Sequence, residues 1–202
     1  MSVDERMVHD IVQKVMANMQ ISGSVSGMHG VFKDMNDAIN ASIEAQKKVC
    51  TMTLDQREQI ISLIRKKTHE NAEILANMGV NETGMGNVGD KILKHHLTAD
   101  KVPGTEDIST IAWSGDRGLT LVEMGPFGVI GAITPATNPS ETVICNCIGM
   151  LAGGNTVVFN PHPNAKKTTI YTINMINEAS IEAGGPDNIA VTAVSYTHLR
   201  AQ

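Results

Sequence analysis

Three short apolar runs, separated by two stretches of helical periodicity, constrain the fold of this 202-residue chain more than any other feature. The runs span 129–133, 156–159 and 188–192, and helix patterns fill 139–151 and 164–183. Strands buried on both faces of a parallel sheet have continuous apolar sequences, and parallel neighbours need a crossover of a dozen or more residues. The sequence therefore predicts an α/β fold with an open parallel sheet, whose last strand is an exposed edge.

Upstream of these runs, the sequence predicts a layer of helices. Apolar residues recur at helical spacing over 35–50, 54–78 and 88–97, with short polar turns between them. The run 119–124 then has strand composition, and a Gly-Pro-Phe-Gly turn separates it from the strand at 129–133. We expect one strand before that turn and one strand after it.

The first 30 residues differ in character from the rest. Residues 2–20 have the apolar periodicity of an amphipathic helix, and 21–30 are rich in serine and glycine, as linkers are. We therefore divide the chain into a helix (1–20), a linker (21–30), a body (31–193) and a tail (194–202). A tethered helix of this length is marginal in water, so its apolar stripe implies a binding partner; the alternative is that it packs on its own domain.

Composition excludes several classes of protein. A hydrophobic content of 42% and a charged fraction of 18% suit a folded chain rather than a disordered one. The net charge of -5 argues against a nucleic acid or an anionic membrane as partner, and no apolar run is long enough to span a bilayer. Three cysteines, an odd count, and no signal-peptide pattern indicate a reducing, cytoplasmic location.

The first candidate site follows the strand at 129–133. It consists of Thr134, Pro135, Ala136, Thr137 and Asn138, where a strand's carboxyl end meets a helix N-terminus. Open α/β sheets bind ligands at such junctions. An asparagine amide can donate a hydrogen bond to an oxyanion, and a helix start adds partial positive charge. The alternative for Asn138 is an ordinary helix N-cap.

The second candidate site follows the next strand, at the same edge of the sheet. It consists of Asn160, Pro161, His162 and Pro163, which could line a nucleotide cleft. No second histidine, cysteine or acid stands at ligand spacing from His162, so the sequence predicts no metal site.

The remaining reactive side chains have structural interpretations. Cys145 and Cys147 are two residues apart on a predicted helix, so we interpret both as small buried hydrophobic residues. Cys50 has no base nearby in sequence that could activate its thiol, so no catalytic role is assigned to it. His95 and His96 diverge on a helix, which favours a surface or interface position over a catalytic one.

Several separate stretches together resemble the CoA-acylating aldehyde dehydrogenases of ethanolamine- and propanediol-utilising bacterial microcompartments. Their order and spacing match that family over 31–192. The stretches are 82–86, 118–123, 134–139, 154–163 and 165–167. The resemblance implies an aldehyde-dehydrogenase-like α/β fold, with an N-terminal helical layer and an incomplete parallel, Rossmann-like cofactor-binding sheet.

The resemblance also implies an activity and roles for residues. Enzymes of this family convert an aldehyde, CoA and NAD to acyl-CoA and NADH, or the reverse, through a cysteine nucleophile. Asn138 matches the family's oxyanion-stabilising asparagine. The motif from Thr134 to Thr137 matches positions beside the NAD cofactor. The segment from Asn160 to Pro163 matches positions near the adenosine of NAD and of coenzyme A. General aldehyde dehydrogenases have a lysine in place of Asn160, so NAD or NADP preference stays open.

Further expectations concern partners and location. The segment 2–20 resembles the encapsulation peptides that bind microcompartment shell proteins, which places the protein in a microcompartment lumen. A homo-oligomer is expected for the full-length protein.

The last nine residues of the chain decide between alternative interpretations of its function. The tail 194–202 resembles translated sequencing-adapter sequence, and no cysteine matches the family's nucleophile, so we expect a truncated, inactive fragment. If the tail is genuine, the alternative is a non-catalytic module that binds a nucleotide or docks to shell proteins. A bifunctional alcohol and aldehyde dehydrogenase is a third possibility, which the targeting helix disfavours.

Overall fold

The computed structural model describes residues 27–194. Its helices are α2 (Met35–Val49), α3 (Leu54–Thr83), α4 (Val88–Lys101), α5 (Pro139–Ala152) and α6 (Lys166–Glu182), with short 3-10 turns η1 (Thr105–Asp107) and η2 (Pro163–Ala165). Its strands are β1 (Val31–Phe32), β2 (Ile111–Gly115), β3 (Gly118–Val122), β4 (Val129–Ile133), β5 (Thr156–Asn160) and β6 (Ala190–Ala193). None of the helices within 27–194 is long and apolar enough to cross a membrane.

The main sheet is parallel throughout, in the order β1-β6-β5-β4, which confirms the predicted α/β class. The prediction that the last strand is an exposed edge is wrong. β1 pairs with β6, with Val31 opposite Thr192, and all four residues of β6 are buried. A strand of two residues has no periodicity to detect, so only the three-dimensional structure reveals that β1 covers the edge of β6.

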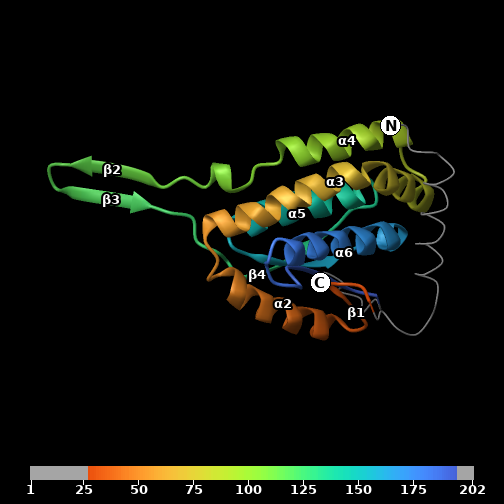
Figure 1. The fold of residues 1–202 in the computed structure, drawn as a ribbon, viewed down its shortest axis with the longest axis horizontal. Helices are drawn as coiled ribbons and strands as arrows, with labels where there is room; N and C mark the ends of the chain where they lie inside the picture. The colour runs from red at the N-terminus through yellow and green to blue at the C-terminus, as the bar shows by residue number, and fades with distance from the viewer. Residues whose placement is uncertain (1–26, 195–202) are drawn as a thin grey trace, which may run out of the picture.

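The sheet lies between helices on both faces (Figure 1). α2 covers one face, where Ala38 packs with Val158 and Val191. α5 and α6 cover the other, and α3 lies over both, with α4 beyond it against α3 and α5. Phe159 on β5 and Ile144 on α5 are fully buried in the core between these layers. Burial of apolar side chains on this scale is the main stabilising contribution to such a fold.

Helix α3 is longer than its sequence pattern predicts. It begins with a capping box, in which Thr53 and Gln56 exchange side-chain and backbone hydrogen bonds, and it ends at Gly84 in the left-handed conformation at φ 68°. The prediction ended it at 78. The extra residues bring Glu82 to the start of α6, where its carboxylate accepts hydrogen bonds from the backbone N–H groups of Lys167 and Thr168, at 2.7 and 2.8 Å.

A hairpin of β2 and β3 projects from the body (Figure 1). The two strands predicted around the Gly-Pro-Phe-Gly turn do flank that segment, but they belong to different sheets. β3 pairs antiparallel with β2, with Ile111 opposite Val122 and Gly115 opposite Gly118, whereas β4 starts the parallel sheet. β2 has no counterpart among the strands predicted from the sequence. Its five residues include Ser114 and Gly115, which weaken the strand signal.

The ends of the described region join the body. Met28 packs against the core, and the backbone N–H of His29 donates to Asn174 Oδ1 at 2.7 Å, although both residues fall in the predicted linker. Val194 N donates to Phe32 O at 2.8 Å, one residue into the predicted tail. The predicted helix at 1–20, most of the linker and residues 195–202 lie outside the described residues and stay predictions.

Candidate functional site

The two predicted site segments lie at one edge of the parallel sheet. β4 and β5 are neighbours, so their carboxyl ends deliver the segments 134–138 and 160–163 side by side. The backbone N–H of Thr134 donates to Asn160 O at 3.1 Å, which ties the two segments together directly. The structure thus brings together the residues that the sequence analysis grouped.

These residues differ in exposure. Thr134, Ala136 and Pro161 are buried, and Asn160 is half-buried. The exposed ones, at the edge itself, are Pro135, Thr137, His162 and Pro163. The buried hydroxyl of Thr134 has no hydrogen-bond partner within the described part of the chain. A buried polar atom without a partner is costly unless a ligand or water satisfies it, so this hydroxyl marks the edge as a fitting place for a polar ligand.

His162 has a local role. Its Nδ1 accepts a hydrogen bond from Asn164 N at 3.1 Å, which caps the start of η2. Among residues 27–194, no group of three or more histidine, cysteine or acidic side chains could hold a metal ion.

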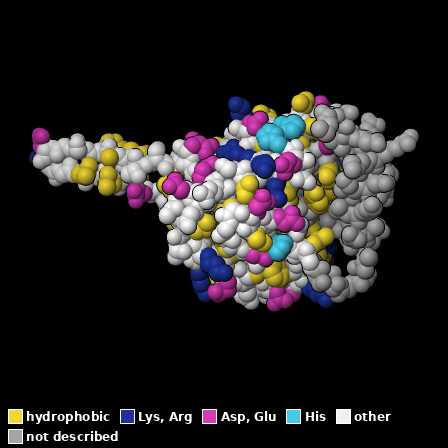
Figure 2. Space-filling view, viewed as in Figure 1, with side chains coloured by type: hydrophobic (Ala, Val, Ile, Leu, Met, Phe, Trp, Pro, Cys, Tyr) yellow, Lys and Arg dark blue, Asp and Glu magenta, His cyan; other side chains and the backbone are white. Residues whose placement is uncertain are grey.

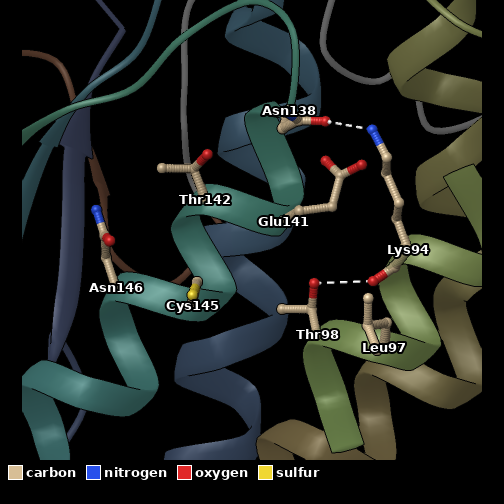
Figure 3. A pocket seen from close by; sticks show the side chains of 8 residues that line it. All are labelled: Lys94, Leu97, Thr98, Asn138, Glu141, Thr142, Cys145 and Asn146. Carbon is tan, nitrogen blue, oxygen red and sulfur yellow. Dashed lines mark hydrogen bonds between the residues drawn. The ribbon is translucent and has the colours of Figure 1, made fainter. Parts of the chain in front are cut away.

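Asn138 does not act as a side-chain cap for α5, although it occupies the N-cap position. Its Oδ1 instead accepts hydrogen bonds from Lys91 Nζ at 3.2 Å and Lys94 Nζ at 3.3 Å, both on α4. Figure 3 shows the hydrogen bond between Lys94 and Asn138. The ordinary N-cap alternative is therefore wrong for this asparagine.

Lys91 is a central residue of the site that the sequence analysis did not identify. It is only 4% exposed, and its Nζ donates to Thr137 O at 2.5 Å and to Glu141 Oε1 at 3.0 Å. Glu141, on the first turn of α5, is 7% exposed. The spacing of the sequence could have indicated its burial, because Lys91 lies four residues before His95 and eight before Ala99, which places all three on one face of α4.

His95 is buried, so the predicted surface position is wrong for it. Its Nδ1 lies 2.7 Å from Lys91 O and its Nε2 lies 2.8 Å from Ser140 Oγ, which is itself 3.2 Å from Glu141 Oε2. Burial lowers the pKa of His95, although the nearby Glu141 carboxylate opposes the shift. His95 is therefore a neutral imidazole at neutral pH.

His96 points away from this network. It stacks on His69 of α3, with ring centroids 4.9 Å apart, in the surface position that the sequence analysis favoured.

A groove of about 280 Å³ lies between α4 and α5, beside Asn138. Its walls come from the two facing helices, as Figure 3 shows. The lining residues are Lys94, Leu97, Thr98, Asn138, Glu141, Thr142, Cys145 and Asn146. The groove therefore combines a polar end, at Asn138 and Lys94, with apolar contacts further along.

Cys145 and Cys147 do not provide an activated thiolate. Cys147 is buried as predicted, and burial raises its pKa to about 12. Cys145 is exposed in the groove, which corrects its predicted burial, and partial burial also raises its pKa. Both are thiols at neutral pH, whereas a reactive cysteine needs a lowered pKa. Cys50 follows α2, on the opposite face of the sheet from the groove.

The N-terminus of α6, next to the segment 160–163, is filled by a side chain of the protein. The Glu82 carboxylate accepts from two backbone N–H groups there, and its Oε2 also accepts from Thr168 Oγ1 at 2.7 Å. Lys166 Nζ donates to Val194 O. The positive end of this helix is therefore neutralised internally rather than left open for a phosphate.

Comparison with known proteins agrees with this architecture. Residues 16–193 match the aldehyde dehydrogenase family. The chain is 46% identical to the acetaldehyde dehydrogenase (acetylating) of Bilophila wadsworthia, over 98% of this chain and 42% of that protein. It therefore spans about two fifths of the length of this relative.

Two solved structures are also similar. One is the propionaldehyde dehydrogenase from the Clostridium phytofermentans fucose utilisation bacterial microcompartment, at 72% identity and a TM-score of 0.82, covering 84% of this chain and 39% of that one. The other is an engineered glycolyl-CoA reductase with bound NADP+, at 46% identity and a TM-score of 0.79, covering 81% of this chain and 38% of that one.

Proposed function

This chain belongs to the aldehyde dehydrogenase family, and we propose that it forms the N-terminal part of an enzyme that converts a small aldehyde, CoA and NAD to acyl-CoA and NADH, reversibly. The names of similar proteins support the substrates, since they include an acetylating acetaldehyde dehydrogenase and a glycolyl-CoA reductase. The chain by itself is catalytically inactive in this proposal, because none of its cysteines matches the family's nucleophile and burial raises the pKa of the Cys145 and Cys147 thiols.

The observation that carries the proposal is the setting of Asn138. Attack of a cysteine thiolate on an aldehyde carbon turns the carbonyl oxygen into an oxyanion, which then needs hydrogen-bond donors. Asn138 offers an amide at the N-terminus of α5, beside the groove. Its carbonyl oxygen is engaged by Lys91 and Lys94, so the amide nitrogen is available to donate. The helix N-terminus adds partial positive charge at the same place.

The sheet edge fits a nicotinamide cofactor. The residues that would hold it are Thr134 to Thr137, beside the reacting end, and Asn160 to Pro163, near the adenosine, where part of CoA would also lie. The unpartnered Thr134 hydroxyl supports a polar ligand at this edge. When bound, the cofactor accepts the hydride of the aldehyde. Glu82 supports NAD over NADP, because its carboxylate already occupies the α6 N-terminus and would repel an additional phosphate.

The projecting hairpin supports a homo-oligomer of the full-length enzyme. Both faces of the hairpin carry exposed apolar side chains, with Trp113 on one face and Leu119 and Leu121 on the other. Figure 2 shows hydrophobic side chains along the projecting hairpin. An isolated two-stranded ribbon is marginally stable in water. A second copy of the chain that packs against the hairpin would bury these side chains.

The location of the protein in the cell is proposed from its similarity to known proteins. We propose that residues 2–20 bind microcompartment shell proteins and place the enzyme in a microcompartment lumen within the cytoplasm. The microcompartment origin of the similar propionaldehyde dehydrogenase supports this location.

The proposal is tested by recovering the gene. Sequencing the source DNA across the codon for Val194 should reveal a frame that continues into a sequence with a new cysteine. The complete enzyme should form NADH from propionaldehyde, CoA and NAD, and Asn138→Ala should lower kcat by about 10²- to 10³-fold. Asn40→Ala, an exposed asparagine on α2 and on the other face of the sheet, is the matched control. A complete enzyme that makes NADH without acyl-CoA, or an Asn138→Ala variant with unchanged kcat, contradicts the proposal.

A further inference from the structure

We propose that Lys91, together with Lys94, is a positioning residue that fixes the orientation of the Asn138 side-chain amide, so that its carbonyl oxygen faces α4 and its NH₂ group points away from α4. The role of that NH₂ group in stabilising an oxyanion rests on the proposed function. The orientation itself rests only on the geometry of the buried network between α4 and α5.

The chemistry of the lysine side chain decides which way the amide points. An ammonium group has three donors and no acceptor. Two ammonium groups approach the Asn138 amide, Lys91 Nζ at 3.2 Å and Lys94 Nζ at 3.3 Å. Only the carbonyl oxygen can face such partners, because a flipped amide would oppose donors to donors. The amide nitrogen must therefore point away from α4, and within the described structure it donates to no other protein group.

Lys91 is itself held rigidly. Its ammonium group is buried and uses its three donors on three different acceptors: Thr137 O, Asn138 Oδ1 and Glu141 Oε1. Two of these acceptors belong to the residues that form the turn before α5. One side chain therefore fixes both the backbone before Asn138 and the Asn138 amide.

Glu141 makes this arrangement possible. A buried ammonium without a counter-charge is strongly disfavoured, and the Glu141 carboxylate at 3.0 Å supplies the charge. Its second oxygen lies 3.2 Å from Ser140 Oγ, which lies 2.8 Å from His95 Nε2. Every member of this network therefore has a polar partner, the condition under which buried polar networks impose a single geometry.

Lys94 restrains the amide from the solvent side. It lies three residues after Lys91, on the adjacent part of the same helix face, and is exposed. Its side chain lines the groove, so its ammonium group contacts Oδ1 from the outer end. The inner and outer lysines together hold the carbonyl oxygen on the α4 side, so the NH₂ group points away from α4.

The first test uses nuclear magnetic resonance on the 15N,13C-labelled 202-residue chain. Lys94 is exposed, so Lys94→Met should leave the core intact while removing one donor to Oδ1. We expect the Asn138 Cγ resonance to shift, because that carbonyl loses a hydrogen bond. The matched control is Lys101→Met, an exposed lysine at the other end of α4, which should leave the resonance in place. An unmoved Cγ resonance in Lys94→Met overturns the proposed orientation.

The second test removes the buried pair together. In the double variant Lys91→Met, Glu141→Met, no buried charge is left without a partner. We expect the order parameter of the Asn138 side-chain amide to fall from about 0.85 to below about 0.6, the values that separate rigid from flexible groups. A folded double variant that keeps a rigid amide would show that Lys91 is structural only. Neither test uses enzymatic activity, so a complete enzyme that lacked acylating activity would refute the proposed function and leave the orientation standing.

Discussion

Replacing Lys91 with methionine leaves the buried Glu141 carboxylate without its counter-charge. Both side chains are more than nine-tenths buried, so solvent cannot screen the remaining charge. Breaking a buried ion pair from one side costs about 3 to 5 kcal/mol of the free energy of unfolding. Native domains have a total of roughly 5 to 15 kcal/mol, so Lys91→Met should lose a large part of its stability.

The assay is urea unfolding of the chain, followed by circular dichroism. With a slope of about 2 kcal/mol per M urea, a loss of about 4 kcal/mol lowers the midpoint by about 2 M. The double variant Lys91→Met, Glu141→Met should recover most of the loss, because replacing both ions with hydrophobic residues of similar volume is often neutral. Lys101→Met serves as the exposed control, with an expected change within about 0.5 kcal/mol.

Two results would refute this reasoning. One is a Lys91→Met variant that unfolds at the same urea concentration as Lys101→Met, which would mean that water reaches Glu141. The other is a double variant as unstable as the single one, which would mean that lysine packing rather than its charge carries the stability.

Three further predictions follow from single contacts. The pKa of His95 is lowered, so the imidazole binds a proton more readily in the unfolded chain than in the folded one. The free energy of unfolding should therefore fall as the pH drops below about 6.5, by at most about 1.4 kcal/mol per pH unit. His95→Gln should remove this pH dependence in urea titrations at several pH values, and a pH dependence equal to that of His96→Gln would contradict the prediction. Glu82→Gln should lower the free energy of unfolding, measured in urea, by about 1 to 2 kcal/mol, because the α6 N-terminus loses a charged cap. An effect no larger than that of Glu44→Gln, which changes an exposed acid on α2, would argue against the cap. Trp113→Ser with Leu121→Ser should reduce the oligomer mass of the complete enzyme in light scattering; an unchanged mass would remove the hairpin from the interface.

Much of the site could be predicted because its signals are local. The segments 134–138 and 160–163 each begin where an apolar strand ends, so their placement at one sheet edge needs only the rule that parallel strands end on the same side. Lys91 could not be assigned from its neighbours. Its partners Asn138 and Glu141 lie 47 and 50 residues further along the chain, and nothing in the local pattern of α4 names them.

The sequence by itself determined the α/β class, the order of the helices and the strands β4, β5 and β6, because hydrophobic periodicity and helix-boundary residues act over a few positions. Tertiary structure alone decided that β1 covers β6, that β3 pairs with β2, and that Glu82 caps α6. It also decided that two lysines of α4 hold the carbonyl oxygen of Asn138. These contacts join residues that are distant in the chain, and their energies depend on burial and geometry that exist only once the layers have packed.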